Sequence, residues 1–149
     1  MKIVRVIVGI VIGVGYGVLV GEITLQLLQL TYDPKYPGPM IPDKAGWARL
    51  TAFFVAVVTS FCGALAGVFV GLARANAGRG AVIGASFGLG LFLALTLWNL
   101  LDYGSWLMRE PAHVWPILLR DIGSQFVVLT LGLPLVGLIT GFITSRLKL

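Results

Sequence analysis

The chain has 149 residues, of which 58% are hydrophobic and only 11% are charged, and its mean hydropathy is +0.96. This composition excludes a soluble domain with a solvated exterior, so the medium around the protein must be lipid. The net charge of +5 comes from basic residues near the ends of apolar runs. They favour lipid headgroups, not nucleic acid, as partners. Because Cys62 is the only cysteine, an internal disulfide and a paired-cysteine metal site are excluded.

Four charge-free stretches approach the roughly 20 residues that a helix needs to cross a hydrocarbon core about 30 Å thick. They are residues 6–21, 50–73, 80–101 and 122–145. The first is short, but the chain stays largely apolar to Leu30, so its helix is expected to continue past Glu22. Continuous apolar runs favour helices over barrel strands, which alternate. A cleavable signal peptide is disfavoured because no small-residue cleavage site follows the first run. The predicted fold is an all-α integral membrane protein with four transmembrane helices.

Two patterns occur twice. "GIVIGVGYG" at 9–17 returns as "GAVIGASFG" at 80–88, and "LAGVFVGL" at 65–72 returns as "LVGLITGF" at 135–142. The two offsets differ by one residue, which a single insertion in a loop would produce. The sequence therefore predicts two parallel copies of a helical hairpin, residues 1–75 and 76–149, that form one membrane domain with both termini on the same face.

The connections differ between the two membrane faces. Basic residues are dense in the short segments at the chain ends and in the 74–79 turn, which contain no acidic residue. This bias predicts that both termini are cytoplasmic, in a bacterial inner membrane. The other face carries a Pro-rich extended connection at 31–49 and a second connection at 102–121, whose segment 105–120 is expected in the headgroup layer. All four tryptophans fall on this outer side: Trp47, Trp98, Trp106 and Trp115.

Glycines spaced four apart predict grooves without side chains on the helix surfaces. Lipid does not drive helices together by the hydrophobic effect, so small-xxx-small surfaces associate by close backbone packing. The spacing does not distinguish a neighbour within the chain from one in another chain. Pro134 is expected to kink the fourth helix and release the carbonyl of Thr130. The predicted packing residues are Gly9, Gly13, Gly17, Gly21, Gly63, Gly67, Gly71, Gly80, Gly84, Gly88, Gly137 and Gly141.

No catalytic set is convincing. "GASFG" at 84–88 fits the G-x-S-x-G pattern of hydrolases, but Ser86 lies inside a predicted membrane helix without the strand-turn-helix elbow and the nearby base that this pattern needs. A triad of Ser105, His113 and Asp121 has no support from spacing. We therefore expect no enzyme activity, no cofactor and no metal.

The two copies of the repeat differ most clearly in a set of polar residues that only the first copy carries. Glu22, Gln26 and Gln29 share one helix stripe, whereas the second copy has leucines at the matching positions. A carboxylate deep in lipid is costly and is usually paired or facing water, whereas at headgroup level it costs little, and both depths remain open for Glu22. If Glu22 is deep, it lines a polar pocket. The candidate pocket residues are Glu22, Gln26, Gln29, Asn99, Asp102 and Gln125.

Two functions compete on this evidence. The first is a non-catalytic four-helix membrane subunit that packs into a homo-oligomer or a larger membrane complex, as the glycine grooves favour. The alternative is a small transporter or channel, with its path between the two copies and an outer-leaflet pocket around Glu22. An enzyme that acts on lipid or quinone is a distant third, because it needs a cluster of titratable groups.

Overall fold

The computed structural model describes residues 2–30, 44–109 and 111–146, and the regular structure in these ranges is helical throughout. Four helices are long and apolar enough to cross a membrane: Lys2–Leu30, Ala48–Leu72, Ala77–Ser105 and Val114–Arg146. This result confirms the predicted all-α fold with four membrane-spanning helices. It also confirms that the first helix runs on past Glu22. The elements are α1 (Lys2–Leu30), α2 (Lys44–Leu72), α3 (Ala77–Arg109), α4 (Pro111–Gln125), η1 (Phe126–Leu131) and α5 (Gly132–Arg146).

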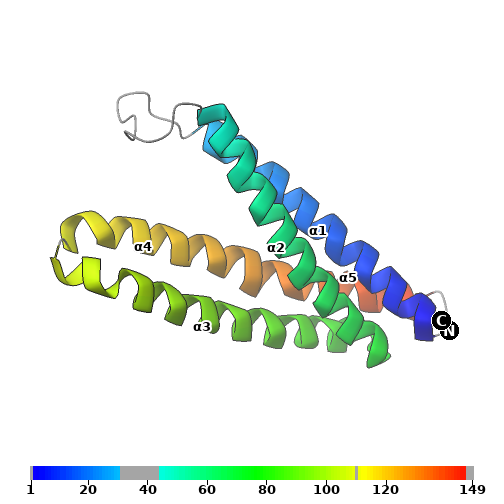
Figure 1. Cartoon of the computed structure of the whole chain (residues 1–149). Coiled ribbons are helices and arrows are strands. Elements are labelled where there is room, and N and C mark those ends of the chain that lie inside the picture. Colours follow the sequence, from blue (N-terminus) through cyan, green and yellow to red (C-terminus); the bar gives the residue numbers. More distant parts are fainter. Residues whose placement is uncertain (1, 31–43, 110, 147–149) are drawn as a thin grey trace.

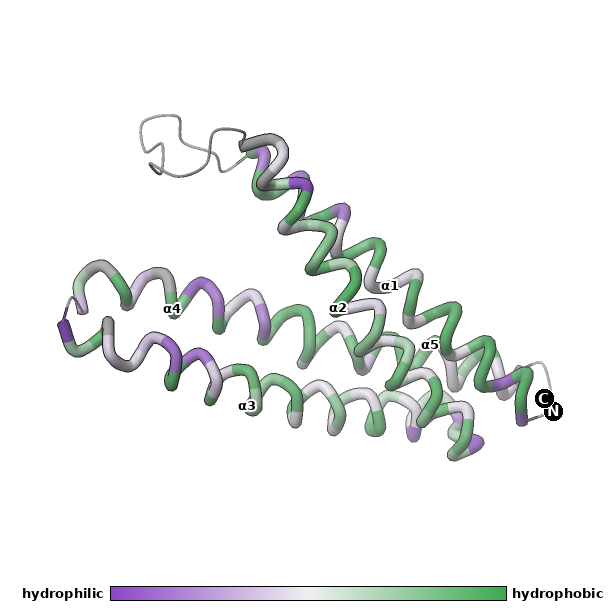
Figure 2. The backbone as a smooth tube through the Cα atoms, in the orientation of Figure 1, coloured by the Kyte–Doolittle hydropathy of each residue, from purple (hydrophilic) through white to green (hydrophobic). Residues whose placement is uncertain are grey.

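The helices form two hairpins that diverge (Figure 1). In the first, α1 lies along α2; in the second, α3 lies along the continuous path of α4, η1 and α5. The hairpins meet near the chain ends, where α5 contacts both α1 and α2 and where α2 contacts α3. From there they splay apart toward the outer connections, so the molecule has the shape of a V. Apolar residues dominate the middle of each hairpin, and hydrophilic residues gather toward the ends (Figure 2).

The turn between the hairpins is specified locally. The amide of Ala75 donates to the carbonyl of Val70 at 3.3 Å, and the amide of Arg74 donates to that of Gly71 at 3.3 Å. These two bonds form a Schellman motif, with Arg74 in the left-handed region at φ 49°. Asn76 then caps α3, because its side-chain oxygen accepts from the amide of Arg79 at 3.0 Å. The two helices are thus joined by a tight, capped turn.

The second outer connection is largely helical, because α3 continues to Arg109 and α4 begins at Pro111. The location of residues 105–120 in the headgroup layer stays a prediction. Proline is well tolerated in the first turn of a helix, and a basic residue in the last turn complements the helix dipole. These features allow both helices to extend beyond the apolar runs. The extended connection predicted for residues 31–49 is wrong for residues 44–49, because α2 begins at Lys44, after the last proline of this segment; residues 31–43 lie outside the described residues.

The fourth span changes its helical period in its middle. The segment η1 is a π-helix, and it ends three residues before the proline at position 134. A proline removes an amide donor, and a π-helical turn is one way to rearrange the surrounding backbone hydrogen bonds. The amide of Gly132 donates to the carbonyl of Leu129 instead of that of Val128, its partner in a regular α-helix.

Glycines bring the backbones of each hairpin into contact. A Cβ atom added at Gly63 would lie 2.5 Å from the carbonyl oxygen of Gly13, and one added at Gly9 would overlap the backbone of Gly67. In the second hairpin, a Cβ at Gly80 would overlap the Gly137 carbonyl. The grooves on α1, α2, α3 and α5 are therefore occupied within this chain, which answers the question that the spacing left open.

Where the hairpins meet, they share a small core. Ala66 from α2 packs with Leu129 and Leu133 from the second hairpin, and the partly buried ring of Tyr16 packs against this cluster from α1. Phe69 and Phe87 add a contact between α2 and α3, with ring centroids 5.9 Å apart. This core holds the base of the V, so any opening between the hairpins must lie farther toward the outer ends.

Candidate functional site

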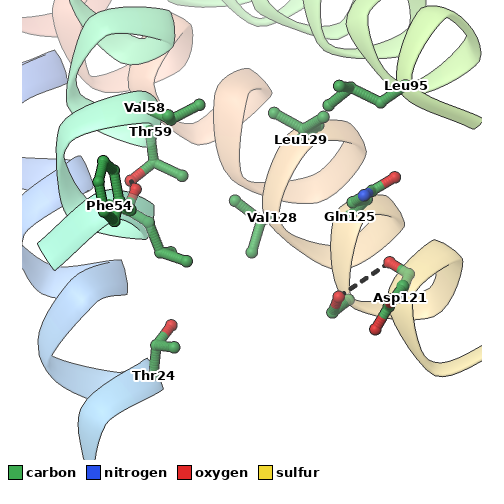
Figure 3. A pocket seen from close by; sticks show the side chains of 11 residues that line it. Thr24, Phe54, Val58, Thr59, Leu95, Asp121, Gln125, Val128 and Leu129 are labelled. Carbon is green, nitrogen blue, oxygen red and sulfur yellow. Dashed lines mark hydrogen bonds between the residues drawn. The ribbon is translucent and has the colours of Figure 1, made fainter. Parts of the chain in front are cut away.

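A cleft of about 460 Å³ opens between the two hairpins, on the outer side of the shared core. Figure 3 shows α1 and α2 on one side and α3, α4 and η1 on the other. Its volume falls in the range of about 300–1,000 Å³ that is usual for small-molecule sites. The lining residues are Thr24, Phe54, Val55, Val58, Thr59, Leu95, Asp121, Ser124, Gln125, Val128 and Leu129.

The hydroxyl groups of the cleft already donate to backbone carbonyls. Thr24 donates to Val20 at 2.8 Å, Thr59 to Val55 at 2.6 Å, and Ser124 to the carbonyl of Asp121 at 2.9 Å. A hydroxyl has one hydrogen to donate and two lone pairs that accept. These three groups therefore present acceptors to whatever enters the cleft.

A pair of polar contacts joins α3 to α4 at the rim of the cleft. The amide of Asn99 donates to the side-chain oxygen of Gln125 at 3.0 Å, and the Tyr103 hydroxyl donates to the Asp121 carboxylate at 3.5 Å. Asp121 also pairs with Arg120 at 3.3 Å. The Arg120 side chain is 76% exposed and that of Asp121 is 31% exposed. An exposed pair of this kind is weak, so it leaves the carboxylate available to a competing cation.

The six residues of the predicted pocket are distributed over two places. The structure brings Asn99 and Gln125 together, and Gln125 lines the cleft. Glu22 accepts from Gln26 at 3.3 Å on the exposed surface of α1. The exposed residues of the set are Glu22, Gln26, Gln29 and Asp102.

Helix geometry explains why the Glu22 stripe and the cleft are on different sides of α1. The cleft is lined by Thr24. A residue two positions away from Thr24 is rotated by about 200° on a helix with 3.6 residues per turn. At about 1.5 Å per residue, Glu22 also lies roughly 30 Å along α1 from Lys2. This distance is close to the thickness of a hydrocarbon core.

The sequence reasoning missed Asp121, Thr24 and Thr59 as lining residues. Asp121 was treated as the charged limit of the fourth apolar run, and it entered only as a member of the unsupported triad. One available signal was its spacing of four residues from Gln125, which places the two side chains on one face of a helix. The two threonines gave no comparable signal, because a hydroxyl on a membrane helix usually bonds to its own backbone.

A hydrogen bond links the hairpins just inside the cleft. The Tyr16 hydroxyl of α1 donates to the Val128 carbonyl of η1. A Cβ atom at Gly132 would overlap the Tyr16 ring and hydroxyl, so this close approach requires glycine. Tyr16 therefore sets how closely α1 and the second hairpin approach at the base of the cleft.

The fold and cleft define a class: a multi-pass helical membrane protein with an intramembrane opening between two hairpins. Among the described residues, no group of three His, Cys, Asp or Glu side chains is placed to hold a metal ion. No protein-family model, curated protein or solved structure matches the chain.

Proposed function

We propose that this chain is a non-catalytic four-helix membrane subunit that assembles with copies of itself or with a larger membrane complex. The observation that carries this proposal is the open space at several glycines inside the spans, of which Gly15 and Gly90 lie in the apolar runs of α1 and α3. A Cβ at Gly15 on α1 or at Gly90 on α3 would meet nothing within 4 Å. Bare backbone that no helix of this chain covers is the kind of surface on which membrane helices of different chains pack.

The test is assembly in a mild detergent. We expect the parent protein to elute as an oligomer or to co-purify with a defined partner. The Gly15→Leu and Gly90→Leu variants should fold but associate at least about tenfold more weakly, because the added side chains block close backbone approach. Light scattering coupled to size exclusion measures the mass. A parent protein that is monomeric, or variants that assemble like the parent, would contradict the subunit proposal.

Within this proposal, the two hairpins are a tandem duplication. The support is that three contacts recur at the offsets found in the sequence. Gly9 meets Gly67 as Gly80 meets Gly137. The contact of Gly13 with Gly63 corresponds to that of Gly84 with Leu133. The contact of Gly71 with Arg5 and Val6 corresponds to that of Gly141 with Asn76 and Ala77.

We also propose that the protein lies in a bacterial cytoplasmic membrane with both termini in the cytoplasm. The support is the basic, acid-free character of the chain ends and of the turn at 74–79. In a Cys62→Ala background, the Arg79→Cys variant should react with an impermeant thiol reagent only from the cytoplasmic side. Cysteine at Asp102, which is exposed, should react only from the opposite side. The reverse pattern would invert the proposed topology.

A small transporter or channel is the second candidate, and the cleft between the hairpins is the observation that favours it. If a cation path runs there, purified protein in proteoliposomes should carry a proton or alkali-cation flux. Asp121 lies in the cleft, whereas Glu22 lies on the exposed side of α1. Asp121→Asn should therefore lower the flux several-fold, and Glu22→Gln tests the path around Glu22 in the same assay. Absence of flux in the parent would remove this candidate.

A further inference from the structure

The carboxylate of the cleft lies at its outer end, and the inner end is mostly apolar. Asp121 and Thr24 lie at one end of the opening, and Val58 and Leu129 lie toward the other, where Thr59 is the polar neighbour of Val58 (Figure 3). Leu129 is eight residues farther along the fourth span than Asp121, which corresponds to roughly 12 Å at the rise of an α-helix. Such a gradient matches a molecule with a polar head at the membrane boundary and an apolar chain below it.

Most polar groups of the cleft accept hydrogen bonds, and the donor among them is the side-chain amide of Gln125. Among the described residues that line the cleft, Asp121 is the one carboxylate, and none is a lysine or arginine. The hydroxyls of Thr24, Thr59 and Ser124 have already donated to backbone carbonyls. A carboxylate in a cleft whose hydroxyl oxygens also accept favours a cationic head that donates several hydrogen bonds, because charge-assisted bonds are stronger than neutral ones.

The Arg120 side chain does not fill this role from within the cleft. It pairs with Asp121 at 3.3 Å, yet it is 76% exposed and lies outside the lining. An ion pair in that position is screened by solvent and contributes little, whereas an ammonium group inside the cleft would be partly shielded from water. Exchange of the guanidinium for a ligand ammonium is therefore favourable.

We propose that the cleft binds an amphiphile with an amine or ammonium head and an apolar chain, the head at Asp121 and the chain between Phe54, Val58 and Leu129. A volume of about 460 Å³ suits a small amphiphile of this kind and is too small for a transmembrane helix about 10 Å wide and 30 Å long. This inference goes beyond the subunit role and stands on the geometry of one chain, whether or not the chain assembles.

The test uses photoreactive hexadecylamine, which carries a diazirine in its chain, and the photoreactive hexadecanoic acid of the same design. Each probe is added to nanodiscs that hold single copies of the full chain, and crosslinked residues are mapped by mass spectrometry. We expect the amine to label cleft residues of α2 and η1 with an apparent affinity about tenfold above that of the acid. Asp121→Asn should lose this preference, because it removes the charge and keeps the shape.

Glu22→Gln is the matched control, because it removes an exposed carboxylate that lies outside the cleft. Labelling should be unchanged in this variant. Val58→Trp fills the apolar end and should lower labelling by both probes, which keeps the test decisive if Asp121→Asn fails to fold. The proposal is overturned if the two probes label equally, if Glu22→Gln acts like Asp121→Asn, or if Val58→Trp labels like the parent. A failure of assembly leaves these outcomes unaffected.

Discussion

Gly13→Leu should prevent the first hairpin from closing. A Cβ atom at this position would overlap the backbone of Gly63 and Ala64, and a backbone cannot move aside as a flexible side chain can. Overpacking a core usually costs about 1–3 kcal/mol, and a clash with backbone on both helices should cost more than about 3 kcal/mol. The free energy of unfolding, measured by denaturant titration in mixed micelles, checks this expectation.

The control is two residues away on the same helix. Gly15 has nothing within 4 Å of its added Cβ, so Gly15→Leu brings the same side chain into the same span without a clash. Its unfolding free energy should change by about 0.5 kcal/mol or less. Equal destabilisation by the two substitutions would mean that loss of glycine from α1, and not contact with α2, controls stability. The packing argument would then fail for the α1 and α2 pair.

Gly132→Val should force the hairpins apart at the base of the V. The new side chain would occupy the space of the Tyr16 ring and hydroxyl, and it would break the hydrogen bond from Tyr16 to the Val128 carbonyl. Overlap of this kind costs about 1–3 kcal/mol, whereas loss of the bond alone in Tyr16→Phe should cost about 0.6–1.7 kcal/mol. Distances between spin labels on Val18 and Leu119, both exposed, should broaden and lengthen in Gly132→Val.

A double variant separates the clash from other effects of the substitution. Truncation in Tyr16→Ala removes the group that the valine meets, so Tyr16→Ala with Gly132→Val should cost less than the sum of the two single changes. Residues in direct contact typically show coupling of about 0.5–3 kcal/mol. Additive costs would show that the contact between Tyr16 and Gly132 does not control the angle of the V.

The two hairpins also carry different polar side chains next to the cleft. Tyr16 supplies the hydroxyl that reaches η1, while the matching residue of the proposed second copy is Phe87, which packs against Phe69. The polar contacts between helices at the outer end, from Asn99 to Gln125 and from Tyr103 to Asp121, lie in the second hairpin. Two similar hairpins that carry different polar groups are suited to bind one asymmetric ligand between them.

Much of the fold could be predicted because its causes are local. Long apolar runs predict spans in lipid, and Arg74 and Asn76 lie where a short turn was expected. Glycine spacing predicted close backbone approach. It did not identify the contacting helix, because that contact depends on residues that are distant in the sequence.

The sequence by itself determined the medium, the number of spans and the places where bare backbone is available, because hydropathy and helical period act within about 20 residues. The tertiary structure alone decided that the glycine grooves pair within the chain, that the hairpins splay, and that Asp121, not Glu22, lines the space between them. The physical reason is the rotation of each helix about its own axis. The side of a helix that faces a neighbour is set by how two hairpins dock, and the π-helical segment shifts that side halfway along the fourth span.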